Sequence, residues 1–133
     1  MDLVARLRDA AYEATSLARR RLLHRRVAEV LRAASDGRDD PGRFALIAGH
    51  ERAAGRDAEA ADAFREAGAR ARAVYANREA LDHLGTALAL GHPDVAGLQT
   101  LIGELRTVLG DYAGAVAALE AAAAVTPDAG LPA

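Results

Sequence analysis

The feature that most constrains the fold of this chain is a phrase of small and bulky residues that occurs twice, about 55 residues apart. In each copy a small residue is followed by Gly after seven positions, by Ala after five more, and then by a bulky residue and another Ala. The first copy comprises Phe44, Ile47, Ala48, Gly55, Ala60, Phe64 and Ala67, and the second comprises Ile102, Gly103, Gly110, Asp111, Tyr112, Ala115, Leu119, Ala122 and Pro127. Small residues let two helices approach closely while bulky ones fill the gap, so the phrase predicts a helix-turn-helix unit.

This unit resembles the tetratricopeptide repeat, whose period is about 34 residues. A further copy fits between the two, because Gly68, Ala80, Leu84 and Ala87 stand 35 residues before their equivalents in the second phrase. The first and middle repeats would share the helix at residues 57–76, where we expect the regularity of the array to break. The resemblance implies an all-α, antiparallel α-helical array, a TPR-like α-solenoid that presents binding surfaces rather than an active site.

Composition agrees with packed helices and excludes several functional classes. The chain has 133 residues and is 51% hydrophobic, but only 4% of its residues are aromatic, which favours Ala-rich helices over a sheet. The absence of Cys excludes disulfides, zinc–thiolate sites and thiol catalysis. There is no apolar run of transmembrane length and no basic-then-apolar leader, so we expect a cytoplasmic protein that does not enter a membrane.

Apolar spacing and turn residues predict seven helices. They cover about residues 2–14, 17–34, 43–54, 57–76, 77–90, 95–109 and 111–125. Thr15 and Ser16 are the expected break between the first two helices. The expected core face of the second helix consists of Leu23, Val27, Val30, Leu31 and Ala34.

These elements divide the chain into four parts. We expect an N-terminal helical pair at 1–34, a loop at 35–42, TPR-like repeats at 43–128 and a frayed tail at 129–133. The charge is distributed unevenly along the chain. Residues 1–34 carry eight Arg and four acidic residues, whereas residues 79–133 carry one Arg and seven acidic residues. Solvated helix faces explain this asymmetry, and docking of the basic end on an acidic partner is the alternative.

The order of shorter phrases extends the family resemblance. They are Ala11-Tyr12-Glu13, the Arg-rich run 19–29, Ile47-Ala48-Gly49-His50, Ala54-Gly55-Arg56-Asp57, Ala67-Gly68, Asn77-Arg78-Glu79-Ala80-Leu81 and Ala87-Leu88. Over residues 5–125 this order is similar to the helical segment of actinobacterial LuxR-type and STAND-type ATPase regulators. The resemblance implies a non-catalytic protein–protein interaction module, a scaffold or sensor arm of a bacterial transcriptional or signalling regulator.

The chain departs from those regulators in its functional motifs. It has no G-x-x-x-x-G-K-[ST] phosphate loop, no acidic magnesium motif and no recognisable DNA-binding helix-turn-helix. Their ATPase and DNA-binding activities therefore do not carry over to this sequence. A fragment of such a regulator and a stand-alone relative are both consistent with the pattern.

We expect no enzymatic activity, cofactor or metal. The four histidines, His24, His50, His83 and His92, lack the spacing of a metal site. Neighbouring acidic–His pairs such as His50 and Glu51 point about 100° apart on a helix, so they do not converge on one site. No Ser lies in a nucleophile elbow.

Two kinds of partner are consistent with the sequence. The tetratricopeptide resemblance implies a concave groove lined by Arg52, Arg65, Arg72, Thr100, Glu104 and Thr107, in which the three Arg residues would suit an acidic protein or peptide. Solvated helix surface is the alternative for these side chains. A nucleic-acid-binding helical domain using the Arg-rich helix at 19–32 is the competing function, but the chain is acidic overall and no aromatic residue is interleaved with the Arg cluster.

The last predicted helix indicates how the array ends. Asp111 and Glu120 are its only charges, and Val116, Leu119, Ala122 and Ala123 can face the preceding helix. The apolar residues left on the other side are Ala113, Ala117, Ala121, Ala124 and Val125. Helix arrays normally end in a polar face, so this surface predicts a missing next repeat, a homodimer or docking within a larger regulator, unless the exposed alanines have no partner.

Overall fold

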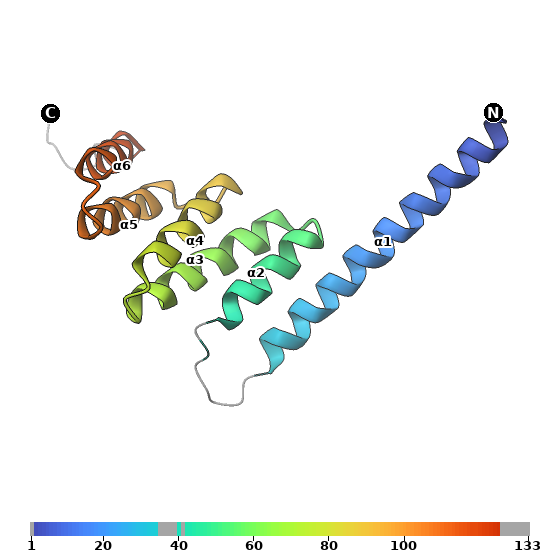
Figure 1. Cartoon of the computed structure of the whole chain (residues 1–133), viewed down its shortest axis with the longest axis horizontal. Helices are drawn as coiled ribbons and strands as arrows, with labels where there is room; N and C mark the ends of the chain where they lie inside the picture. The colour runs from blue at the N-terminus through green and yellow to red at the C-terminus, as the bar shows by residue number, and fades with distance from the viewer. Residues whose placement is uncertain (1, 35–39, 41, 126–133) are drawn as a thin grey trace, which may run out of the picture.

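The computed structural model describes residues 2–34, 40 and 42–125, and this part of the chain is all-α. Its six helices are α1 (Leu3–Ala33), α2 (Arg43–Ala53), α3 (Asp57–Ala73), α4 (Asn77–Ala89), α5 (Val95–Val108) and α6 (Tyr112–Val125). Each helix packs mainly against its neighbours in sequence. Helices α2 to α6 form a row, and α1 lies at one end of this row with its N-terminal half projecting away (Figure 1).

The helical pair predicted for residues 1–34 is a single helix, so the prediction of seven helices is wrong. Helix α1 runs through the expected break without interruption, and the Thr15 hydroxyl donates a 2.9 Å hydrogen bond to the Ala11 carbonyl inside the helix. A Thr that bonds backward in this way does not cap a new helix. Most of the predicted loop at 35–42, the helix stop after residue 125 and the tail at 129–133 lie outside the described residues.

The face of α1 that packs against α2 also differs from the prediction. Leu23, Val27 and Val30 are exposed, whereas Ala28 is buried and Leu31 is half-buried against α2. A stripe of His24, Ala28 and Leu31 therefore makes the contact. The sequence pattern concealed this stripe because a polar residue occupies one of its positions.

A buried carboxylate joins α1 to the start of the array. The Glu51 side chain on α2 is almost fully buried, and its Oε1 lies 3.6 Å from Nε of Arg32 on α1. Its Oε2 lies 3.0 Å from Nε of Arg56 in the next turn. Two guanidinium groups thus offset the cost of burying one carboxylate.

The helices reverse direction through similar left-handed turns. Gly55, Gly91 and Gly110, which directly follow the predicted helix boundaries at residues 54, 90 and 109, have positive φ angles of 76°, 88° and 83°. Tyr75 occupies the equivalent place between α3 and α4 with a φ of 62°. This conformation is strained for a residue that carries a Cβ.

Replacing Tyr75 with Gly is therefore expected to stabilise the protein by about 1 kcal/mol, because relief of strain exceeds the added entropy of the unfolded chain. The side chain is 86% exposed, so little packing is lost. Urea denaturation of the variant measures the gain. Tyr75→Ala is the matched control, and an equal gain from Ala would contradict a backbone origin.

Two close contacts repeat along the array. A Cβ built on Gly68 of α3 would lie 2.7 Å from Cγ of Leu84 on α4, and one built on Gly103 of α5 would lie 2.7 Å from Cγ of Leu119 on α6. The two pairs are 35 residues apart, as the sequence spacing predicts. Helix α3 also packs against both α2 and α4, so it serves two successive helix pairs.

The core consists of two clusters joined by Phe64, which packs against both. The smaller cluster contains Ala28, Ile47, Ala48 and Ala63 and connects α1, α2 and α3. The larger cluster connects α3 to α6. Its buried members are Ala71, Ala80, Leu84, Ala87, Leu98, Ile102, Leu105 and Ala118.

Candidate functional site

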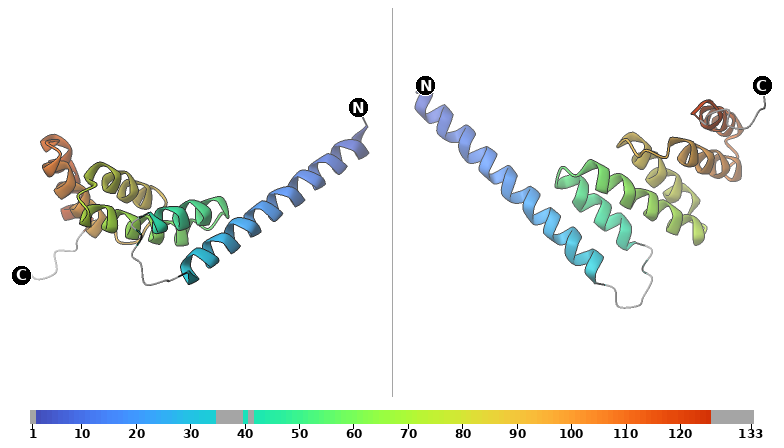
Figure 2. Two further views of the ribbon diagram at one scale, coloured as in Figure 1. Left: turned by 60° about the horizontal axis from the view of Figure 1, so that its bottom comes forward. Right: turned by 180° about the vertical axis from the view of Figure 1, so that it is seen from behind.

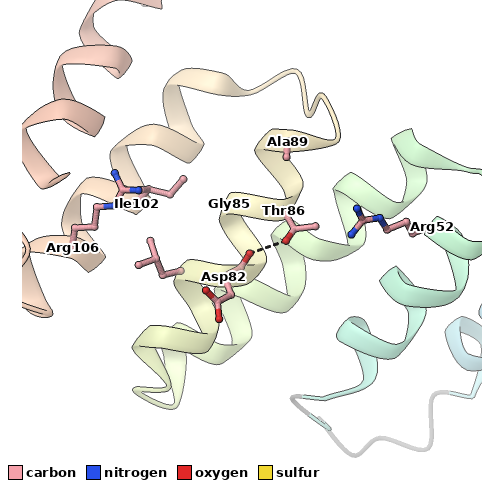
Figure 3. Close-up of a pocket in the computed structure, with 8 residues that line it drawn as sticks. Arg52, Asp82, Gly85, Thr86, Ala89, Ile102 and Arg106 are labelled. Carbon is pink, nitrogen blue, oxygen red and sulfur yellow. Dashed lines mark hydrogen bonds between the residues drawn. The ribbon is translucent and has the colours of Figure 1, made fainter.

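A shallow groove of about 550 Å³ runs across α4, between α2 on one side and α5 on the other. Its lining residues are Arg52, Leu81, Asp82, Gly85, Thr86, Ala89, Ile102 and Arg106. Helix α4 supplies most of this surface, while α2 and α5 contribute one Arg each and α5 adds Ile102. Figure 3 shows Arg52 and Arg106 on opposite sides of α4, with Asp82 and Thr86 between them.

The two arginines of this groove have different surroundings. Arg106 is held at the start of α6, where its Nη1 donates a 3.1 Å hydrogen bond to the Gly114 carbonyl and its Nε lies 3.9 Å from Oδ2 of Asp111. Arg52 is exposed and makes no ion pair with any described residue. Arg106 is therefore held in place by the fold, whereas the guanidinium group of Arg52 forms no ion pair within the described residues.

Polar groups on α4 complete the groove. Thr86 donates its hydroxyl to the Asp82 carbonyl at 2.9 Å, the bond drawn in Figure 3. The Asp82 residue is exposed, so its carboxylate can accept hydrogen bonds from a bound molecule. Leu81 adds a half-buried apolar side chain beside these polar groups.

Of the six residues predicted to line a groove, Arg52 alone lines this one. Arg72 on α3 and Glu104 on α5 pair with each other at 2.6 Å. The hydroxyl groups of Thr100 and Thr107 donate to carbonyls one turn earlier in α5. The charges of Arg72 and Glu104 are thus engaged in joining α3 to α5.

Arg65 takes part in a clamp between α3 and the α4–α5 loop. Its Nη2 lies 2.8 Å from Oδ2 of Asp94, the N-cap of α5. A hydrogen bond from the Gly97 backbone N–H holds the pKa of Asp94 below its ordinary value, desolvation opposes this shift, and the charge of Arg65 adds to it. The predicted contact residue Arg65 is therefore paired within the fold.

His92 forms the second part of this clamp. The ring is 6% exposed, its Nδ1 accepts the Asp94 backbone N–H at 3.0 Å, and its Nε2 lies 3.0 Å from Oδ1 of Asp62 on α3. A neutral ring protonated at Nε2 satisfies both contacts. His92 is thus a connecting group between the loop and α3.

A pair of histidines was not anticipated from the sequence. His24 on α1 and His50 on α2 approach with their Nδ1 atoms 2.9 Å apart, so one ring donates and the other accepts. The two residues are 26 positions apart on different helices, and only the packing of α1 on α2 brings them together. Among the described residues there is no group of three or more His, Asp or Glu side chains that could hold a metal ion.

The predicted self-association residues lie on α6 at the far end of the row. Ala113, Ala117, Ala124 and Val125 are exposed and Ala121 is half-buried. The residues of α6 that are buried differ partly from the predicted inner face, since they are Ala115, Ala118 and Ala122, while Val116 and Ala123 are exposed. Leu119, also on the predicted inner face, lies against Gly103 across the α5–α6 pair but is 43% exposed.

Comparison with known proteins identifies no relative: no family model, no curated protein and no solved structure matches this chain. In the part of the chain that the structure describes, none of the helices has the length and apolar character needed to cross a membrane.

Proposed function

We propose that this chain is a non-catalytic protein–protein interaction module whose groove between α2, α4 and α5 binds an acidic segment of a partner protein. The observation that carries this proposal is Arg52, an exposed guanidinium at the groove that no described carboxylate neutralises. Arg106 offers a second positive charge on the other side of α4. Guanidinium groups bind carboxylates through directed, charge-assisted hydrogen bonds, which provide specificity as well as affinity.

The floor of the groove further defines the partner. Leu81 offers apolar contact between the two arginines, and Asp82 accepts backbone N–H groups or repels a misplaced carboxylate. A segment that alternates acidic and apolar residues matches this order. Because residues 79–133 are strongly acidic, the most acidic part of the partner should lie toward Arg52.

The wider biological role follows the same proposal. A TPR-like α-solenoid built from the repeated Gly68–Leu84 and Gly103–Leu119 contacts would serve as the scaffold or sensor arm of a bacterial transcriptional or signalling regulator. In that role the chain would work in the cytoplasm and recognise another protein, or another part of a larger regulator.

Fluorescence anisotropy with a labelled peptide in which Asp alternates with Leu tests the groove. We expect Arg52→Glu to weaken binding by at least about tenfold, equivalent to about 1.4 kcal/mol, because it replaces an attraction with a repulsion. Arg78→Glu is the matched control, since Arg78 is also exposed but lies at the other end of α4 from Thr86 and Ala89. Equal weakening by the two variants would indicate a non-specific charge effect and would contradict the groove.

A second candidate, nucleic-acid binding, is favoured by the position of the Arg-rich part of α1. Arg19, Arg20 and Arg26 are exposed on a helix that is largely uncovered (Figure 2). A mobility-shift titration with duplex DNA and single-stranded RNA at low ionic strength separates the two functions. Salt-sensitive binding that is lost in an Arg19→Glu/Arg20→Glu variant would support this candidate, whereas absence of binding at low salt removes it.

A further inference from the structure

The N-terminal half of α1 carries an apolar stripe that no described residue covers. Figures 1 and 2 show this half projecting beyond the other helices. The stripe, which we call the α1 seam, consists of Leu3, Leu7, Ala10, Ala14 and Leu17, spaced alternately four and three residues apart. This spacing is typical of a helix that packs against another helix along its length. Yet Leu7 is 62% exposed, and Leu3 and Leu17 are also exposed.

The α1 seam continues an interface that already exists in the molecule. The same spacing of four and three passes through Arg21 to His24, Ala28 and Leu31, the residues that contact α2. A helix lying on the seam would therefore extend the line of α2 beyond its turn at Gly55. A helix that ends before this turn would fit on the seam without meeting α2.

We propose that the occupant is the same segment of a second copy of this chain, packed antiparallel along the α1 seam. In this arrangement Leu3 faces Ala14 of the second copy and Leu7 faces its Ala10. The layers formed by Leu3, Leu7, Ala10 and Ala14 then each combine one large and one small residue, so the two helices can approach closely. Leu17 lies past the N-terminal end of the second helix in this register. A parallel arrangement would set Leu against Leu and Ala against Ala.

Charges beside the seam favour the same arrangement. Arg6 and Glu13 lie one heptad apart on one flank, and neither makes an ion pair with a described residue. The antiparallel register brings Arg6 of each copy to Glu13 of the other, which forms two reciprocal ion pairs. On the opposite flank Val4 meets Ala11 of the second copy.

The neighbouring antiparallel register, shifted by one heptad, is unfavourable for two reasons. It sets Arg6 against Arg20 of the second copy and Glu13 against its own equivalent, so both contacts are repulsive. It also brings the N-terminal end of the second helix to the level of Arg21. The Arg21 side chain lies against Gly55: a Cβ built on Gly55 would be 3.5 Å from the guanidinium carbon of Arg21.

The expected dimer is weak and separates on dilution. Two helical segments of this length bury less than the roughly 1,200–2,000 Å² of a stable protein interface. Sedimentation velocity of the full chain over a micromolar concentration series should therefore show a monomer–dimer equilibrium. This proposal does not depend on the peptide groove, because it involves a different helix.

Substitutions on α1 test the seam and its register. Leu7→Glu is expected to abolish the dimer, while the matched control Leu23→Glu should leave it unchanged, since Leu23 is equally exposed at 62% on the same helix but lies off the seam. Arg6→Glu or Glu13→Arg alone should weaken the dimer about tenfold or more. The double variant Arg6→Glu/Glu13→Arg should restore it, because both ion pairs re-form with their charges exchanged.

Three results would overturn the proposal. One is a wild-type chain that stays monomeric throughout the concentration series. Another is a dimer that survives Leu7→Glu but is lost in Ala117→Glu, which would place self-association on α6. The third is failure of the double charge exchange to restore a dimer that the single variants weaken. Circular dichroism of each variant checks that the helical array is retained.

Discussion

Replacing Leu84 with Ala is expected to lower the free energy of unfolding by about 2–5 kcal/mol, the largest effect of a single truncation proposed for this chain. The Leu84 side chain is 0% exposed and fills the space between α3 and α4 against Gly68. It also belongs to the cluster that connects α3 to α6, so the resulting cavity weakens the larger part of the core. Urea denaturation followed by far-ultraviolet circular dichroism measures the change.

Leu46→Ala provides the control for this prediction. Leu46 lies on α2 and is exposed, so the same truncation should change the free energy of unfolding by less than about 1 kcal/mol. Similar losses from the two variants would mean that helix propensity, rather than burial, dominates the stability of the array. Burial of Leu84 between α3 and α4 would then not be a main source of stability.

Replacing Gly68 with Val is expected to cost about 3 kcal/mol, the second large effect, because overpacking a buried contact forces its neighbours to move. A Cβ at this position would meet Leu84 at 2.7 Å and the Ala80 carbonyl oxygen at 3.4 Å. The first neighbour is fully buried and the second is backbone, so neither can move away easily. Thermal or urea denaturation should show the loss.

Gly49→Val separates this packing effect from the general effect of Val in a helix. Gly49 lies within α2, and nothing approaches its Cβ position within 4 Å. The control should therefore be neutral or slightly stabilising, since Val has a higher helix propensity than Gly.

The double variant Gly68→Val/Leu84→Ala should be more stable than the sum of the single losses predicts. Simple additivity would contradict direct contact between the two sites.

The repeated helix pairs could be predicted from the sequence because backbone contact restricts residue choice. A close approach of two helices requires Gly or Ala at one position and a bulky partner on the other helix, and this requirement recurs in Gly68 with Leu84 and in Gly103 with Leu119. The turns after α2, α4 and α5 could be predicted equally well, since a residue with a positive φ angle is usually Gly. Tyr75 gave no such signal, although it occupies the same conformation.

The course of α1 could not be predicted in the same way. A Thr-Ser pair has the composition of a helix cap, but Thr15 can also bond backward within a continuous helix, and local sequence does not decide between the two. The buried face of α1 was also misjudged, since His24 interrupts the stripe that contacts α2. Its pairing with His50 depends on how two helices are aligned, which spacing along the chain does not specify.

The candidate site was predictable only in part for a similar reason. Arg52 was identified by its place in the repeat, and it lines the groove. Arg65 and Arg72 were identified by the same reasoning, but Asp94 and Glu104 neutralise them across helices. The type of a charged residue is visible in the sequence, whereas the availability of its charge depends on partners that only the fold brings near.

We propose that the groove between α2, α4 and α5 is the surface that binds an acidic partner. Its most direct test is a nuclear magnetic resonance titration of the isotope-labelled chain with the Asp–Leu peptide. If the groove binds the peptide, amide signals at Arg52, Gly85, Thr86 and Arg106 should shift together and saturate, with little change at Arg19 and Arg20 on α1. Shifts confined to α1, or no saturable shift in the groove, would contradict the claim.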